Sequence, residues 1–176
     1  PVTDYLQSIK HKLRGYVISH GHMDHIGALI HTVPLYPAPI YGSRFTIGMV
    51  NAQFEKAQEN GMAYQQQTVE MNMDTHEQIK RGVFTIELVR MTHSIPESSL
   101  ISVDTPLGKV INTGDFRLDP EPLDDMPSDI IRLKELGNKN VVLLMSESTN
   151  ANKIGRTPTE HTLVSSFDDI IRNAKG

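Results

Sequence analysis

Four side chains that can bind a metal ion are crowded near the start of the chain. The segment "HGHMDH", residues 20–25, contains three histidines and one aspartate: His20, His22, Asp24 and His25. Imidazole nitrogen and carboxylate oxygen are ligands suited to zinc or manganese. His20 and His22 leave a strand together and can face one point, while Asp24 and His25 begin a helix and can face another. Two divalent ions about 3.5 to 4 Å apart need such a divided set, so the segment predicts a site for two metal ions rather than a solvated loop.

Further ligands are expected where other strands end. Three predicted strands are each followed by one metal-competent side chain: His93 after "VFTIELVRMT", Asp115 after "KVINTG" and Glu147 after "VVLLMS". A histidine after one strand is more often structural than a ligand. Because strand ends can converge at one edge of a sheet, the three residues taken together with "HGHMDH" favour a shared site.

Composition narrows the class of protein. The chain of 176 residues has no cysteine, 38% hydrophobic residues and 22% charged residues. Thiolate metal sites and disulfides are therefore excluded, and a globular fold is indicated. No apolar run reaches the roughly 20 residues of a membrane span, and no segment resembles a signal peptide, so we expect a cytoplasmic protein with no membrane partner. The net charge of −4 argues against nucleic-acid binding, but bound divalent cations would offset it.

The elements that must position these side chains alternate along the chain. Apolar spacing and capping residues predict helices over residues 4–14, 24–32, 44–59, 129–136 and 158–174. The expected strands cover residues 16–19, 40–43, 83–91, 99–104, 109–114 and 141–146. Residues 64–74 are expected to form a loop that leads into a strand. Strands and helices intermix over the whole length, which predicts an α/β (α+β layered) architecture with helices packed on sheet.

Local signals set several boundaries. Ser43 and Ser128 are expected to cap the helices that follow them, and Thr157 with Glu160 is expected to form a capping box around Pro158. The continuous apolar run at 141–146 is expected to be covered on both faces.

Four segments in order along the chain resemble one protein family. "HGHMDH" resembles the metal-binding motif of metallo-β-lactamase-fold hydrolases. "THSIPES", "NTGDFRLDPEPLD" and "SESTNA" resemble the β-CASP branch, most closely the ribonuclease J family. The resemblance implies part of an αββα sandwich, with a partial metallo-β-lactamase domain at 1–150 and the start of the β-CASP region at 151–176. Much of the family's sequence has no counterpart here, including the histidine that completes its second metal site, so we expect a fragment.

The resemblance also implies roles for individual residues. One metal would be bound by His20, His22 and His93, the other by Asp24 and His25, with Asp115 bridging the two. Glu147 would lie beside the metals, and Asp24 and Glu147 would be the acidic residues of the catalytic site. Zinc is the expected ion, with manganese or magnesium as alternatives.

The implied activity is that of a metal-dependent ribonuclease in RNA processing or decay. A hydroxide activated by two metals would cleave RNA phosphodiester bonds, as a 5′ exonuclease, an endonuclease or both, and leave a 5′-phosphate. Ser94 and Ser98 could donate hydrogen bonds to substrate phosphate or only shape a turn, and Arg117, Lys153 and Arg156 are candidate phosphate contacts. The full-length protein is expected to form a dimer or tetramer.

Three alternatives stay open at this point. A small-molecule hydrolase of the same fold, acting on a thioester, lactone or β-lactam, would share "HGHMDH" but not the later segments. A DNA nuclease of the β-CASP group is less consistent with the amino-acid sequence of those segments. A non-catalytic piece with an incomplete ligand set would lose the second ion.

Overall fold

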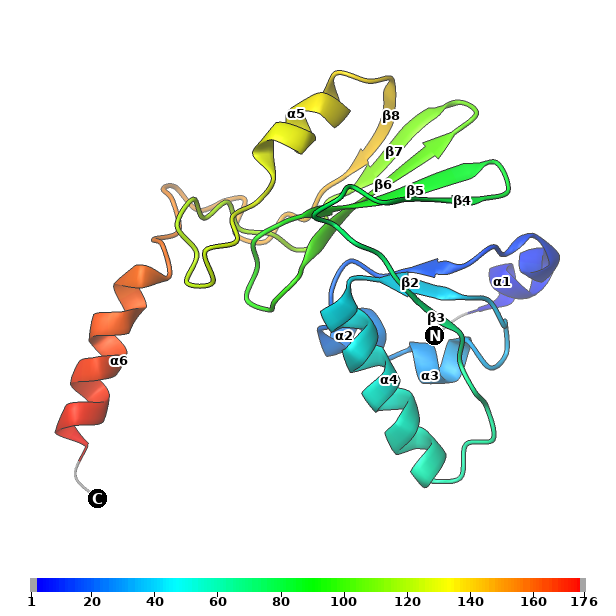
Figure 1. Ribbon diagram of the computed structural model, residues 1–176, viewed down its shortest axis with the longest axis horizontal. Helices are drawn as coiled ribbons and strands as arrows, with labels where there is room; N and C mark the ends of the chain where they lie inside the picture. The colour runs from blue at the N-terminus through cyan, green and yellow to red at the C-terminus, as the bar shows by residue number, and fades with distance from the viewer. Residues whose placement is uncertain (1–2, 175–176) are drawn as a thin grey trace.

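Two β-sheets lie face to face, with helices on their outer sides, in the computed structural model, which describes residues 3–174 (Figure 1). The first sheet has the order β1-β2-β3, all parallel, with strands Tyr16–Val17, Ile40–Gly42 and Thr68–Glu70. The second has the order β4-β5-β6-β7-β8, with strands Gln78–Arg81, Phe84–Arg90, Ser99–Thr105, Gly108–Asn112 and Val141–Met145. The helices are α1 Asp4–Ile9, α2 Met23–Ile26, α3 Leu29–Thr32, α4 Arg44–Glu59, α5 Ile130–Gly137 and α6 His161–Asn173.

Three hydrophobic clusters separate four layers. The first lies between the three-stranded sheet and helices α2 to α4, and contains Ile26, Leu29, Ile40, Ile47, Val50 and Phe54. The second fills the space between the sheets, from Tyr41 and Met71 on one side to Ile86 and Leu88 on the other. The third joins the five-stranded sheet to Leu136 of α5. The predicted αββα layering is therefore confirmed.

In helix α4, residues close together in the sequence determine where the helix begins and which face is buried. The Ser43 hydroxyl accepts a hydrogen bond from the Thr46 backbone N–H at 3.3 Å, as predicted for a cap. Ile47, Val50 and Phe54 are buried at helical spacing against the first sheet. Burial of one stripe fixes which face of α4 meets the sheet.

Two predicted helices differ from the structure. The expected helix over 24–32 is two short helices, α2 and α3, separated at Gly27 and Ala28. Asp129 rather than Ser128 caps α5, since its carboxylate accepts from the Arg132 N–H at 2.8 Å. The Ser128 hydroxyl instead accepts a hydrogen bond from the Thr92 N–H.

The predicted capping box before α6 is wrong. Glu160 is itself the residue that precedes the helix, and no side chain caps α6. The Glu160 carboxylate pairs with Arg117, so tertiary contacts have replaced the local hydrogen bonds.

Strand β8 differs from the expected buried strand. Within residues 3–174 it pairs only with β7, and Val142, Leu143, Leu144 and Met145 are all exposed. The prediction that 141–146 is covered on both faces does not hold for this structure.

Strand β4 was not predicted, because "QIKR" carries too few apolar residues to stand out from the loop before it.

Strand directions bring the candidate ligands to one edge. Strand β6 is antiparallel to β5 and β7, and β8 is parallel to β7, so the carboxyl ends of β5, β7 and β8 share an edge. The segment after β1 reaches the same edge, where the Ser99 N–H donates to the Ser19 carbonyl at 2.9 Å. No helix within residues 3–174 combines the length and apolar character needed to cross a membrane.

Candidate metal centre

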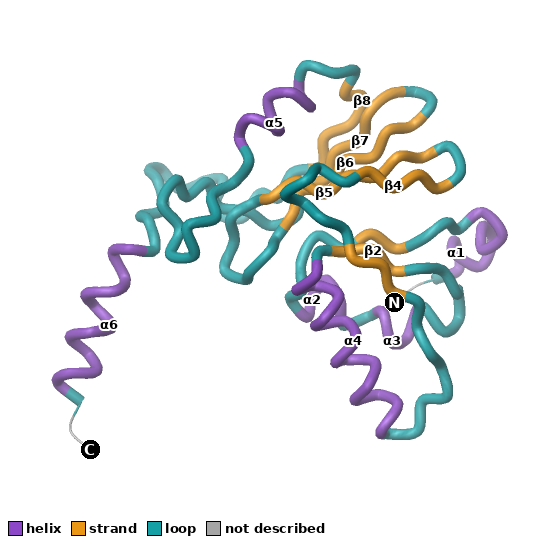
Figure 2. The backbone as a smooth tube through the Cα atoms, viewed as in Figure 1, coloured by secondary structure: helices purple, strands orange, loops and turns teal. Residues whose placement is uncertain are grey.

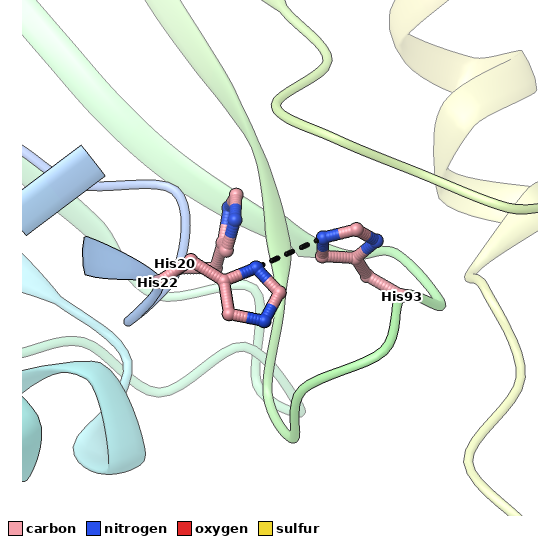
Figure 3. A group of neighbouring side chains, drawn as sticks. All are labelled: His20, His22 and His93. Atoms are coloured by element: carbon pink, nitrogen blue, oxygen red, sulfur yellow. Dashed lines mark hydrogen bonds between the residues drawn. The ribbon is translucent and has the colours of Figure 1, made fainter. Parts of the chain in front are cut away.

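Three histidines from two sheets converge at this edge (Figure 3). His20 and His22 follow β1, and His93 follows β5. His93 Nε2 lies 3.2 Å from His22 Nδ1, and the His20 ring centre lies 4.8 Å from those of both neighbours. One ligand atom from each of the three lies within 4.8 Å of the others. This spacing allows one ion to be held by three nitrogens.

A second group shares His20 with the first. It joins His20, His25 and Asp115, whose ligand atoms also lie within 4.8 Å of one another. Asp115 Oδ2 is 3.4 Å from His25 Nε2 and 3.9 Å from the Nε2 atoms of His20 and His93. Asp115 therefore lies between the two groups, where the prediction placed a bridging ligand. Asp24, predicted to join His25, stands 3.5 Å from His25 Nε2 with most of its side chain exposed.

The chemistry of His20 tests whether a cation fits. His20 is fully buried, and its Nδ1 lies 3.0 Å from the Ser19 hydroxyl. Its Nε2 is buried and has no hydrogen-bond partner within residues 3–174. Burial, and then the nearby His25 and His93 rings, lower the pKa of His20 to about 4. A neutral imidazole with an unpaired, buried nitrogen is suited to donate a lone pair to a metal ion.

His93 is in a similar state. Burial and the adjacent His22 ring lower the pKa of His93, so this imidazole is also neutral at pH 7. Two neutral imidazoles, those of His20 and His93, next to the Asp115 carboxylate are donors suited to a divalent ion. The residues present therefore fit a metal.

Comparison with known proteins identifies relatives of this chain. No family model matches the chain. The chain is 38% identical to Ribonuclease J of Thermus thermophilus over 181 residues, covering 100% of this chain and 31% of that protein. It is 38% identical to Ribonuclease J of Helicobacter pylori strain 26695, over 100% of this chain and 25% of that protein, and 35% identical to the Synechocystis Ribonuclease J over 27% of its length. Over its whole length, the chain is ribonuclease J-like: it matches one part of these longer proteins.

Solved structures support the fold of this ribonuclease J-like chain. A protein of unknown function from Enterococcus faecalis superposes with a TM-score of 0.63 at 21% identity, over 90% of this chain and 39% of that one. A B3 metallo-β-lactamase with an active-site glutamic acid superposes with a TM-score of 0.54 at 14% identity, over 96% and 71%. The chain spans about a quarter to a third of the length of the curated relatives, between 25% and 31% for the first four.

In this ribonuclease J-like chain, Glu147 lies beside the second group of candidate metal ligands, His20, His25 and Asp115. It follows β8 and lines, with His25 and Asp115, a cavity of about 350 Å³. Burial raises the pKa of its carboxyl, but hydrogen bonds led by the Thr149 N–H at 2.7 Å more than offset this and hold the pKa below its ordinary value. Glu147 is thus a charged acceptor next to the candidate metal positions, although it belongs to neither ligand group.

The residues predicted to contact substrate differ in whether the structure leaves them free to do so. Ser98 is buried, and its hydroxyl donates to the Ile95 carbonyl at 3.4 Å, so it serves the turn after His93. Ser94 is exposed and lines a cavity of about 180 Å³ with His93, which makes it the better candidate for a substrate contact. Arg117 pairs with Glu160 and Asp119 and is not a free cation, contrary to its expected role at phosphate.

Sequence reasoning missed two supporting residues. The Ser19 hydroxyl orients His20, and Thr92 anchors the backbone before His93 by bonding to Arg117 and Ser128. Ser19 directly precedes His20, and Thr92 directly precedes His93. This position next to a predicted ligand is the sequence feature that could have identified them.

Gly114 is required by the close approach of three segments behind the site. Its φ is +58°, and a Cβ there would lie 2.9 Å from Ser19 Cβ and from the Ser99 carbonyl oxygen. We expect Gly114→Ala to destabilise the fold by about 1 to 3 kcal/mol, because strain and overlap add. Urea denaturation measures this change.

Gly48→Ala is the matched control for Gly114→Ala. Gly48 lies within α4, and nothing stands within 4 Å of a Cβ placed there. The same substitution should stabilise the protein by about 0.5 to 1 kcal/mol. Equal effects at the two positions would contradict the role given to Gly114.

Proposed function

We propose that the protein containing this chain is a metal-dependent ribonuclease that hydrolyses RNA phosphodiester bonds. The observation that carries the proposal is the convergence of His20, His22 and His93 with His25 and Asp115 at one sheet edge. The named relatives, Ribonuclease J proteins, supply the substrate class. Residues 1–150 would belong to the metallo-β-lactamase domain and 151–176 to the start of the β-CASP region. We also propose a cytoplasmic homo-oligomer.

The chain's own residues define what the site can do. His20, His22 and His93 would hold one ion, and His25 with Asp115 the other, with Asp24 at its exposed side; zinc is the proposed ion. When bound, the ions would activate water and offset the charge of a phosphodiester. The Ser19 hydroxyl orients His20, and Asp115 is placed to contact both positions.

Glu147 gives the site its acid–base group. Its carboxylate faces the same cavity as His25 and Asp115, within reach of a substrate that binds there. We assign to Glu147 and Asp24 the transfer of protons between water and the leaving oxygen. Ser94, exposed beside His93, would donate a hydrogen bond to a phosphate oxygen.

A labelled substrate tests the proposal. The intact protein, loaded with zinc or manganese, is incubated with 5′-labelled, 5′-monophosphorylated RNA and sampled over time. Immediate release of labelled mononucleotide establishes a 5′ exoribonuclease, and labelled fragments of intermediate length establish endonuclease action. Absence of cleavage by protein shown to contain two metals would exclude the ribonuclease and favour a small-molecule hydrolase of this fold. Single-stranded DNA in parallel distinguishes a DNA nuclease.

A further inference from the structure

Helix α6 extends away from the two sheets (Figure 2). None of its residues is buried. Within residues 3–174, the hydrogen bonds that join this region to the loop after β7 come from Thr159 and Glu160. The Thr159 hydroxyl donates to the Glu121 carbonyl at 2.7 Å, and the Glu160 N–H donates to Asp119 Oδ2 at 3.0 Å. Within residues 3–174, the orientation of α6 relative to the sheets therefore depends on a very small set of contacts.

An arginine lies between two carboxylates where the start of α6 meets the loop after β7. Arg117 forms an ion pair with Glu160, and its guanidinium lies 3.9 Å from Asp119 Oδ2. The Asp119 side chain is only 1% exposed, and its other oxygen accepts from the Glu121 N–H at 3.0 Å. Arg117, Asp119 and Glu160 are called here the Arg117 latch. A planar guanidinium can serve two carboxylates at once, which an ammonium group does less well.

Two members of the latch, Arg117 and Asp119, lie on the loop that carries a candidate ligand. Asp115 precedes Arg117 by two residues in the segment after β7. The Arg117 N–H donates to the Thr92 carbonyl at 2.8 Å, and the Thr92 hydroxyl donates to the Arg117 carbonyl. Since Thr92 directly precedes His93, the latch is connected by short, hydrogen-bonded backbone to Asp115 and to His93.

We propose that Arg117 is a positioning residue: the Arg117 latch holds the start of α6 against the loop after β7 and thereby sets the positions of Asp115 and His93 for the reaction. Without Arg117, the buried Asp119 and the nearby Glu160 are two carboxylates with no cation between them, and their repulsion separates α6 from the loop. The loop after β7 then loses the contact with Glu160 that holds it beside the start of α6. The kinetic part of this proposal rests on the proposed ribonuclease function; the placement of α6 does not.

A distance measurement tests the placement of α6. These 176 residues contain no cysteine. In intact protein from which any cysteine elsewhere has been removed, spin labels on Ser165→Cys in α6 and Asn138→Cys after α5 report one distance. We expect a single narrow distribution that broadens with Arg117→Ala and Glu160→Ala. Arg172→Ala, which removes an exposed arginine whose ion pair is with Asp168 of α6, is the matched control and should leave the distribution narrow. An unchanged distribution in Arg117→Ala would overturn the latch.

Turnover tests the positioning role. We expect Arg117→Ala to lower kcat per metal-loaded molecule by about 10- to 100-fold, because a shift of about 1 Å at reacting groups costs that much, while KM changes little. Glu160→Ala should cause a similar loss, and the double variant no more than either, since the residues act as one unit. Arg117→Lys should recover part of the rate. Normal kcat per metal-loaded molecule in Arg117→Ala would overturn the proposal, whereas inactivity of the unsubstituted protein would instead refute the ribonuclease function.

Discussion

Replacing Asp115 by alanine is expected to abolish RNA cleavage while the fold stays intact. Asp115 Oδ2 lies within 3.9 Å of nitrogens from His20, His25 and His93, so one side chain contacts both candidate metal positions. Its loss would remove a ligand from each ion, and we expect the rate to fall by at least about 1,000-fold. The side chain is 36% exposed and fills no part of a core, so stability should change little. Cleavage of labelled RNA and metal content per protein measure the two effects.

His93→Ala should give the same loss for a related reason. It removes one of three nitrogens from the first group and leaves His20 and His22. His20→Ala is a poorer test, because His20 is fully buried and its removal would leave a cavity at the sheet edge. Ser94→Ala is a useful comparison, since the loss of one substrate hydrogen bond should reduce the rate far less than the loss of a ligand. Full activity in either Asp115→Ala or His93→Ala would refute the ligand assignment.

The largest expected loss of stability comes from Arg132→Ala. Glu87 of β5 is 2% exposed, and both of its oxygens accept hydrogen bonds from Arg132 of α5, at 2.6 and 2.9 Å. Removal of Arg132 leaves a buried carboxylate with only the Gln78 amide, 2.8 Å away, as a side-chain partner. We expect the free energy of unfolding to fall by about 3 to 5 kcal/mol, as measured by urea denaturation at pH 7.

Two comparisons separate this effect from a general loss of charge. Arg172→Ala removes an exposed arginine whose Asp168 partner is 3.8 Å away, and should change stability by less than about 0.5 kcal/mol. The double variant Glu87→Leu/Arg132→Met should regain much of the loss, because no unpaired charge is left behind. A double variant less stable than Arg132→Ala would contradict the explanation.

The pH dependence of stability gives an independent check on the same pair. Burial raises the pKa of Glu87, but hydrogen bonds from Arg132 and Gln78 more than offset this and hold it below the ordinary value of 4.5. A lowered pKa means that the pair stabilises the fold fully above pH 4.5 and that this contribution is lost as the pH falls through the folded value. Arg132→Ala should therefore show a smaller decrease in the urea midpoint between pH 7 and pH 3.

Much of the site could be predicted from the sequence because its ligands lie next to local signals. "HGHMDH" places four metal-competent residues together, and His93, Asp115 and Glu147 each follow a run with β periodicity. The Ser43 cap and the buried stripe of α4 likewise depend on residues close in the chain. Where hydrogen bonds and burial act over a few residues, the sequence carries the information directly.

Long-range contacts decided the rest. Ser128 was expected to cap α5, but its hydroxyl is taken by Thr92, 36 positions away in sequence. Glu160 was expected to serve a capping box, but Arg117 provides a charged partner that a local backbone N–H does not match. Exposure of β8 likewise depends on which elements pack beside it, and an apolar run by itself reports only that burial would be favourable. The sequence by itself determined the residues that can bind metal and the periodicity of the strands before them; the tertiary structure decided that His20 is shared by both groups, that Asp115 lies between them, and that Arg117 binds carboxylates, because each depends on side chains brought together from distant segments.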